Sequence, residues 1–120
     1  MEKVPASKGT VLIISREEEV RGPLRRRLQA EGYHCLECVG NPGEMKCLVF
    51  QDIDVVLLDY GLPSDNAVPL FREIKKKHPE VIVIIVTDII NSEEAVKLLD
   101  RGAYDYIIKP FGLDEMIYSV

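Results

Sequence analysis

Several features that would mark particular classes of protein are scarce in this chain. It has three cysteines in 120 residues, which argues against a disulfide framework. No apolar run reaches the roughly 18 residues of a membrane span, and Met1–Gly9 lacks the apolar core of a signal peptide. Positive charge is not in excess, because the net charge is −5, and this argues against a general nucleic-acid surface. We therefore expect a soluble, cytoplasmic protein with no direct nucleic-acid or membrane partner.

The cysteines could still form a metal site, since Cys35 and Cys38 have the C-x-x-C spacing of metal ligands. No second pair completes such a site, however, and the adjacent His34 would point to the opposite face of a strand. We therefore favour the interpretation that these cysteines are buried in a strand.

The chain is long enough for one domain with a proper core, and its apolar segments and turns alternate between strand and helix patterns. Strands are expected at 10–15, 34–38, 54–59, 81–87 and 105–108. Helices are expected between and after them, including short ones at 44–51 and 113–120. Five such units predict an α/β protein with right-handed crossovers and helices on both faces of a parallel sheet. The flavodoxin-like (βα)5 fold has the strand order 2-1-3-4-5. Residues 1–9 are expected to be a flexible lead and 10–120 to be the domain.

Gly22-Pro23 falls where the first helix should already be running. Proline in a helix interior removes a hydrogen bond and clashes with the preceding turn, but it is well tolerated as the first helical residue. We therefore expect either a late helix start near Gly22, which would lengthen the preceding loop, or a kink there.

Polar residues follow several of the predicted strands. The apolar run Val55–Leu58 ends in Asp59, the fourth strand ends at Thr87, the fifth at Lys109, and the first at Ser15. In open parallel sheets, ligands bind outside the carboxyl ends of the strands. A carboxylate, a hydroxyl and an ammonium group on one edge suit a covalent phosphoryl group, with the carboxylate as nucleophile and the other two binding the phosphoryl oxygens.

Over residues 10–119 or so, the chain resembles a known family, the receiver domains of two-component response regulators. The resemblance rests on residues 57–63, which read LLDYGLP, on the Val86-Thr87 strand end, and on residues 102–111, which read GAYDYIIKPF.

The resemblance implies a role for each matching residue. Asp59 would accept a phosphoryl group from a sensor histidine kinase, Thr87 would hydrogen-bond that group, and Lys109 would pair with it. The bond before Pro110 would be cis. Tyr106 would be an aromatic switch that turns inward with Thr87, so that the surface of the fourth helix, fifth strand and fifth helix exchanges partners.

One part of the family pattern is missing. The family usually has two acidic residues after the first strand, which help to hold Mg²⁺, and here those positions are Ser15 and Arg16. Mg²⁺ prefers oxygen ligands that include carboxylates, so we expect a weakened site. Asp59 and Gly61 would remain as ligand positions, and Glu17 could be a substitute. Alternatively, Arg16 could pair with Asp59 and place a permanent positive charge there.

The C-terminal segment gives an expectation about domain organisation. The apolar face of the helix predicted to end at Val120 is incomplete, so we expect a domain excised from a longer protein with a downstream output module. The same face could support a homodimer.

Three functions are compared. The first is a receiver switched by phosphorylation at Asp59, which is a signalling domain and not an enzyme. The second is a phosphorylation-independent pseudo-receiver that acts as a protein–protein interaction module, which Ser15 and Arg16 favour. The third, a nucleotide- or flavin-binding enzyme, needs a phosphate-binding loop after the first strand. We reject it because Glu17, Glu18 and Glu19 would repel a phosphate.

Overall fold

The computed structural model describes residues 9–40, 52–59, 64–88 and 92–109. In this part of the chain five strands form one sheet in the order β2-β1-β3-β4-β5, and every neighbouring pair is parallel. The predicted order is therefore confirmed. The strands are β1 (Thr10–Ile14), β2 (His34–Cys38), β3 (Val55–Asp59), β4 (Ile82–Asp88) and β5 (Asp105–Lys109).

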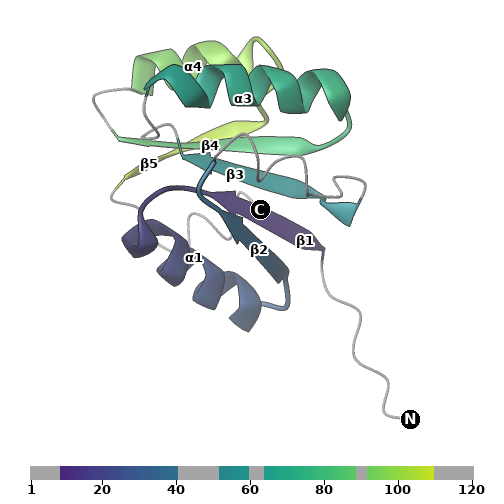
Figure 1. Cartoon of the computed structure of the whole chain (residues 1–120), viewed down its shortest axis with the longest axis vertical. Coiled ribbons are helices and arrows are strands. Elements are labelled where there is room, and N and C mark those ends of the chain that lie inside the picture. The colour runs from purple at the N-terminus through teal and green to yellow at the C-terminus, as the bar shows by residue number, and fades with distance from the viewer. Residues whose placement is uncertain (1–8, 41–51, 60–63, 89–91, 110–120) are drawn as a thin grey trace.

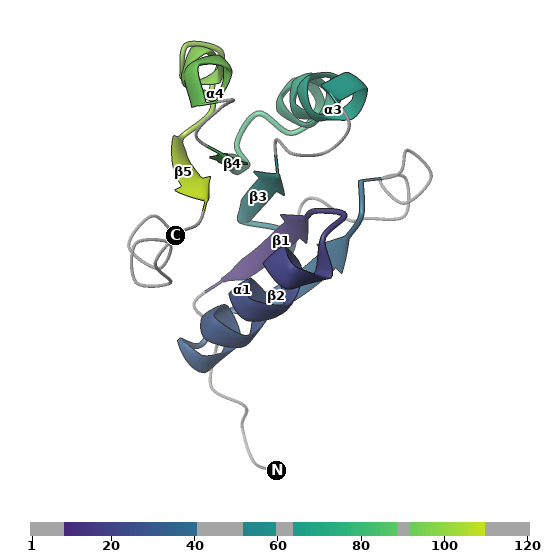
Figure 2. The same cartoon turned by 90° about the vertical axis from the view of Figure 1, so that its left-hand side faces the viewer.

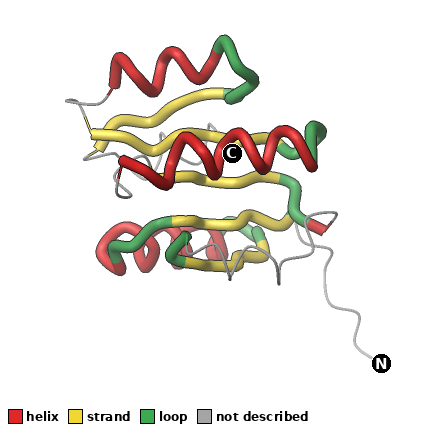
Figure 3. Tube along the Cα trace, turned by 45° about the horizontal axis from the view of Figure 1, so that its top comes forward, coloured by secondary structure: helices red, strands yellow, loops and turns green. Residues whose placement is uncertain are grey.

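The helices cover both faces of the sheet. Figure 1 and Figure 2 show α1 (Glu18–Ala30) on one face, and α3 (Ser64–Lys77) and α4 (Ser92–Leu99) on the other. Figure 3 shows the resulting layers of helix, sheet and helix. The helices predicted at 44–51 and 113–120 lie outside the described residues. Within the part that is described, no helix has the length and apolar character needed to cross a membrane.

Side-chain alternation along the strands divides the core into two clusters. In β3, Leu57 packs in the cluster under α1 and Leu58 in the cluster under α3 and α4. Phe71 of α3 and Leu24 of α1 are buried in their respective clusters, with exposed fractions of 1% and 0%. Burying apolar side chains on both faces is what a parallel sheet of this kind requires.

The end of α1 follows from one glycine. Gly32 has φ +102°, a conformation that other residues adopt only at a cost. The Gly32 N–H donates to the Gln29 carbonyl at 3.0 Å, and the Tyr33 N–H donates to the Leu28 carbonyl at 3.0 Å. These two bonds form a Schellman motif, which confirms Gly32 as the stop and turns the chain directly into β2. Gly102 has φ +113° and the same pair of bonds after α4.

The start of α1 corrects one expectation. The helix begins at Glu18, with Pro23 inside it, so the late start near Gly22 and the longer loop are wrong. A proline at this position leaves the Glu19 carbonyl without its helical donor. Glu19 is exposed, so water can satisfy that carbonyl at little cost. The alternative of a kink at Pro23 remains a prediction.

Candidate functional site at the carboxyl edge of the sheet

The strand register brings the predicted site residues to one edge of the sheet. Ile14 is level with Leu58, so Ser15 and Asp59 follow side by side. Asp59 is level with Val86, the residue before Thr87. At the next strand, Thr87 is level with Ile108 and the backbone of Lys109 follows directly. The predicted convergence of these strand ends is therefore present in the backbone.

Asp59 and Ser15 form a buried polar pair. The Ser15 hydroxyl donates a hydrogen bond to Asp59 Oδ2 at 2.7 Å. The exposed fractions are 0% for Ser15 and 2% for Asp59. A hydrogen bond to an ionised carboxylate is stronger than one between neutral groups, so this contact helps to offset the cost of burying the Asp59 charge.

Further hydrogen bonds fix the N–H, the hydroxyl and the carbonyl of Ser15. Its N–H donates to the Cys38 carbonyl at 3.1 Å, which continues the pairing of β1 with β2 by one residue. Its hydroxyl oxygen accepts a hydrogen bond from the Glu17 N–H at 3.1 Å. Its carbonyl accepts one from Arg21 Nη1 at 2.9 Å. Both the backbone and the side chain of Ser15 are therefore fixed relative to Asp59.

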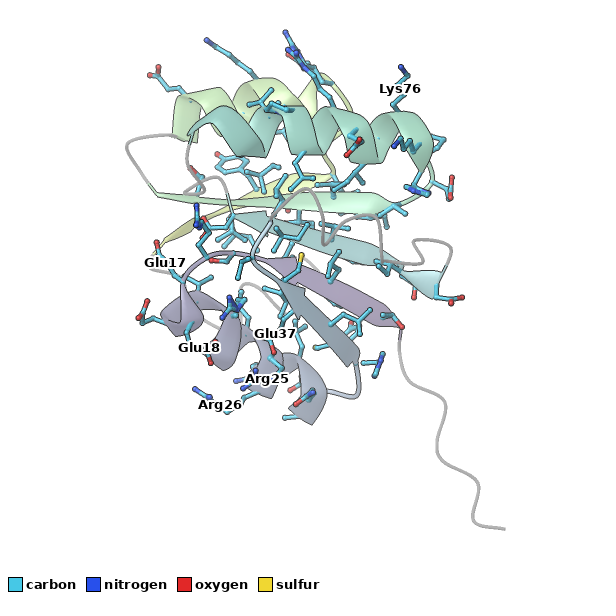
Figure 4. The ribbon with its side chains drawn as sticks, viewed as in Figure 1. Glu17, Glu18, Arg25, Arg26, Glu37 and Lys76 are labelled. Carbon is cyan, nitrogen blue, oxygen red and sulfur yellow. The ribbon has the colours of Figure 1, made fainter. Side chains whose placement is uncertain are left out.

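Arg21 belongs to a group of charged side chains that joins α1 to β2, and which we call the Glu37 cluster: Glu18, Arg21, Arg25 and Glu37. Arg21 donates to Glu18 Oε2 at 2.9 Å and to Glu37 Oε1 at 3.3 Å, and Arg25 donates to the other oxygen of Glu37. Figure 4 shows Arg25 beside Glu37, with Arg26 further out on α1. The hydrogen bond to Glu37 raises the pKa of Arg25 above its ordinary value. The cluster therefore connects Ser15 to the edge strand β2.

Arg16 does not take the place that the sequence suggested for it. Its side chain is exposed, and the ion pairs among the described residues do not include one between Arg16 and Asp59. The expectation of an Arg16–Asp59 pair is therefore wrong. The bond between Ser15 and Asp59 was not foreseen from the sequence, because a serine after a strand gives no signal of where its hydroxyl will point.

The donors that the structure describes at this edge do not fit the Mg²⁺ site of the family. Receiver domains generally bind Mg²⁺ at an acidic site. Among the residues that the structure describes, no three His, Cys, Asp or Glu side chains form a group that could hold a metal ion. The Ser15 hydroxyl approaches Asp59 as a donor, whereas a metal needs oxygen lone pairs. Glu17 has an exposed side chain, and Gly61 lies outside the described residues.

Thr87 and Tyr106 lie on the other face of the sheet from Leu57 and Ile107. Ile85 is level with Tyr106, both pack in the cluster under α3 and α4, and Thr87 comes two residues after Ile85. Thr87 has an exposed fraction of 0%, and Tyr106 is half-buried. Thr87 and Tyr106 are therefore on the same face of the sheet, in diagonal positions on neighbouring strands. Pro110 lies outside the described residues.

Cys35 and Cys38 are free cysteines in β2, half-buried and buried respectively. Burial, and then the negative charge of Glu37, raise the pKa of the Cys35 thiol, although Arg25 opposes this shift. The prediction that both lie in a strand is confirmed, and the prediction that they are buried is confirmed for Cys38 but not for the half-buried Cys35. Cys47 lies outside the described residues.

The fold and the site together define a class. A five-stranded parallel sheet in this order is the flavodoxin-like arrangement, and here a buried aspartate lies at the carboxyl end of the third strand. The family model described as "Response regulator receiver domain" matches residues 11–120. The chain therefore belongs to the receiver domain family of two-component response regulators.

Relatives and solved structures agree with this assignment. The transcriptional regulator NtrC of Escherichia coli K12 is 31% identical over 113 residues, which cover 94% of this chain and 24% of that regulator. KdpE of Mycobacterium tuberculosis H37Rv is 32% identical over 109 residues, covering 89% of this chain and 47% of KdpE. The receiver domain of NtrX from Brucella abortus has a TM-score of 0.83 at 31% identity, covering 90% of this chain and 92% of that one. The chain thus spans about a quarter of the length of NtrC and under half of KdpE.

Proposed function

We propose that this receiver domain accepts a phosphoryl group on Asp59 from the phosphohistidine of a sensor kinase. The observation that carries the proposal is the position of Asp59, a buried carboxylate at the carboxyl end of β3. It lies on the edge where Thr87 is the residue before the end of β4 and Lys109 is the last residue of β5. A carboxylate in such a position can serve as a nucleophile.

The transfer is a simple displacement. A carboxylate oxygen of Asp59 attacks phosphorus, a P–O bond forms, and the P–N bond to the imidazole breaks. The imidazole nitrogen keeps the electron pair and takes a proton from water. Thr87 and Lys109 bind the oxygens of the phosphoryl group in this proposal, by a hydrogen bond and by charge. Asp59 is only 2% exposed, so the groups that cover it must move before a donor can reach it.

The output surface that we propose is the face of α4, β5 and the helix expected after β5. Thr87 moves toward the phosphoryl group, and Tyr106 follows because it lies next on the same face of the sheet. Two large side chains near this surface are already exposed, Val96 in α4 at 41% and Tyr104 before β5 at 65%. Exposed apolar side chains favour a protein partner, here an output domain or protein.

A second function is favoured by one observation, the bond between Ser15 and Asp59. Because the described part of the edge has no acidic cluster for a cation, Asp59 could have a structural role. The chain would then be a pseudo-receiver that binds partners without phosphorylation.

The two functions can be separated by intact-protein mass measurement after incubation with a small acyl phosphate. Phosphorylation predicts one added phosphoryl group that disappears in Asp59→Asn. The matched control is Asp52→Asn, which removes an exposed carboxylate that precedes β3. This variant should still be labelled. If the native chain remains unlabelled by both the acyl phosphate and a phosphorylated kinase domain, the proposal of a phosphoacceptor is wrong and the pseudo-receiver is supported.

A further inference from the structure

We propose that the Ser15 hydroxyl, and not a divalent cation, is the resident partner of the Asp59 carboxylate, so that this receiver site does not depend on cations. Ser15 is then a positioning residue, and Arg21 is the residue that fixes it. The part of this proposal that concerns phosphoryl transfer rests on the function proposed above. The part that concerns cation binding stands independently of it.

The first argument is the direction of the hydrogen bonds. A cation at this edge would need oxygen lone pairs from residue 15 and from Asp59. Ser15 instead presents its hydroxyl hydrogen to Asp59 Oδ2, and its hydroxyl oxygen accepts the Glu17 N–H. One lone pair of Asp59 Oδ2 is therefore already engaged by Ser15.

The second argument is charge. The carbonyl oxygen of Ser15 is the other ligand that this residue could offer, and Arg21 Nη1 lies 2.9 Å from it. A guanidinium keeps its charge at any ordinary pH, so a divalent cation near this carbonyl would face a fixed positive charge. Two positive groups at such a short separation repel each other, and their repulsion weakens cation binding.

The third argument is that other side chains hold Arg21 in its position beside the Ser15 carbonyl. Its side chain is 16% exposed and is bound by Glu18 and Glu37, and Glu37 is also held by Arg25. Figure 4 shows Glu18, Arg25 and Glu37 on the same side of the molecule, over α1 and β2. The position of Ser15 is thus supported by a helix and a strand rather than by its loop alone.

The first test measures cation binding to the native chain. Mg²⁺ is titrated against the ¹⁵N-labelled protein, and Mn²⁺ is then added to locate any site through broadening of nearby amide signals. We expect no saturable change at Ser15 and Asp59 at concentrations that saturate an ordinary receiver domain. Saturable binding centred on these two residues would overturn the proposal.

The second test asks whether the hydroxyl is what excludes the cation. Arg16→Asp supplies one carboxylate at an exposed position, and position 15 is then varied in this background. Ser15→Ala removes the hydrogen bond to Asp59 Oδ2, and we expect this variant to bind Mn²⁺ about tenfold more tightly than the Ser15 background. Ser15→Thr keeps the hydroxyl and should bind as weakly as serine. A residue with only a structural role would not improve binding when it is removed, so equal affinities for alanine and serine would contradict the proposal.

Arg21 is tested in the same Arg16→Asp background. Arg21→Ala should also strengthen Mn²⁺ binding, whereas Arg26→Ala, which removes the same charge from an exposed position on α1, should have a much smaller effect. Similar gains from both variants would mean that general charge, and not the contact with Ser15, controls the site.

Phosphorylation provides the last readout. With a small acyl phosphate, the rate of labelling of the native chain should differ less than about twofold between Mg²⁺ and a chelator, since Mg²⁺ accelerates transfer only where it is bound. Labelling that requires Mg²⁺ would overturn the proposal for Ser15 and leave the phosphoacceptor function intact. If the native chain is labelled in neither condition and is also not labelled by a phosphorylated kinase domain, the phosphoacceptor function fails, and the cation titrations still decide the role of Ser15.

Discussion

The two faces of the sheet are held by different kinds of contact. Under α3 and α4 the core is apolar and includes Phe71, and the ion pair between Lys77 and Glu73 lies within α3 itself. Under α1 there is also an apolar cluster, but Arg21 and Arg25 additionally tie the helix to Glu37 of β2. Apolar packing is not directional, whereas hydrogen-bonded charges fix geometry. Among the described residues, the face that positions Asp59 is thus the one with ion pairs between a helix and a strand.

The largest expected effect is on stability and comes from the apolar face. Phe71→Ala should lower the free energy of unfolding by about 3–5 kcal/mol, since it removes a buried aromatic side chain and leaves a cavity. Urea unfolding measures the loss. The amide signals of Ser15 and Asp59 should change little, because Phe71 packs on the opposite face. Large shifts at these two residues would show that the faces are not separable.

A smaller loss is expected from the directional face. Arg21→Ala removes contacts with Ser15, Glu18 and Glu37 and should cost about 1–2 kcal/mol, because Arg21 is mostly buried. Arg26→Ala, the exposed control, should cost less than about 0.5 kcal/mol. Urea unfolding at low and high salt compares them, and most of the Arg21 effect should persist as salt rises, because salt screens partly buried ion pairs only weakly. Equal costs would remove the special role of Arg21.

Two glycines in and after α1 should respond with opposite signs. Gly32→Ala places a Cβ at φ +102° and should cost about 1 kcal/mol. Gly22→Ala should stabilise the protein by about 0.5 kcal/mol through helix propensity, since the new Cβ meets only the ends of Arg26 and Glu18 at 3.3 and 3.4 Å. Thermal unfolding of both variants tests this. A loss at Gly22 would mean that these two side chains cannot adjust.

The smallest effect concerns the thiol beside the Glu37 cluster. Burial and Glu37 raise the pKa of Cys35, so Glu37→Gln should lower it and speed alkylation of Cys35 at mildly alkaline pH by about two- to threefold. Peptide mapping by mass spectrometry distinguishes Cys35 from the buried Cys38. Unchanged or slower alkylation would show that the charge of Glu37 does not act on this thiol.

The same shift has a consequence for stability. The folded-state pKa of Cys35 lies above the ordinary thiol value of 9.0. The contribution of this thiol to the free energy of unfolding is therefore fully present below pH 9.0, and it is lost as the pH rises through the higher folded-state value. A fall in the free energy of unfolding that begins well below pH 9.0 must therefore have another cause.

The sequence predicted the frame of the site better than its contacts. The apolar run before Asp59 and the stop at Gly32 depend on local patterns, and the strand order follows from general rules of chain topology. The sequence left two alternatives for the start of α1, and the late start proved wrong, because the cost of Pro23 depends on whether one carbonyl can reach water. The partner of Asp59 was missed because hydrogen-bond direction at Ser15 depends on Arg21, Glu17 and Cys38 together, and residue types alone do not specify it. The roles of Thr87, Tyr106, Lys109 and Pro110 in phosphoryl binding and switching remain predictions.

The turns at Gly32 and Gly102 have an evolutionary consequence. Both close a helix and start the next strand at the amino edge of the sheet, through backbone hydrogen bonds and a glycine that few substitutions can replace. The opposite edge carries the reactive groups, and its connection from β1 to α1 is only Ser15–Glu17. Mutation can therefore explore new chemistry at one edge while the other preserves the ability to fold. A lineage could lose a pair of metal-binding acids in this way and keep its receiver architecture.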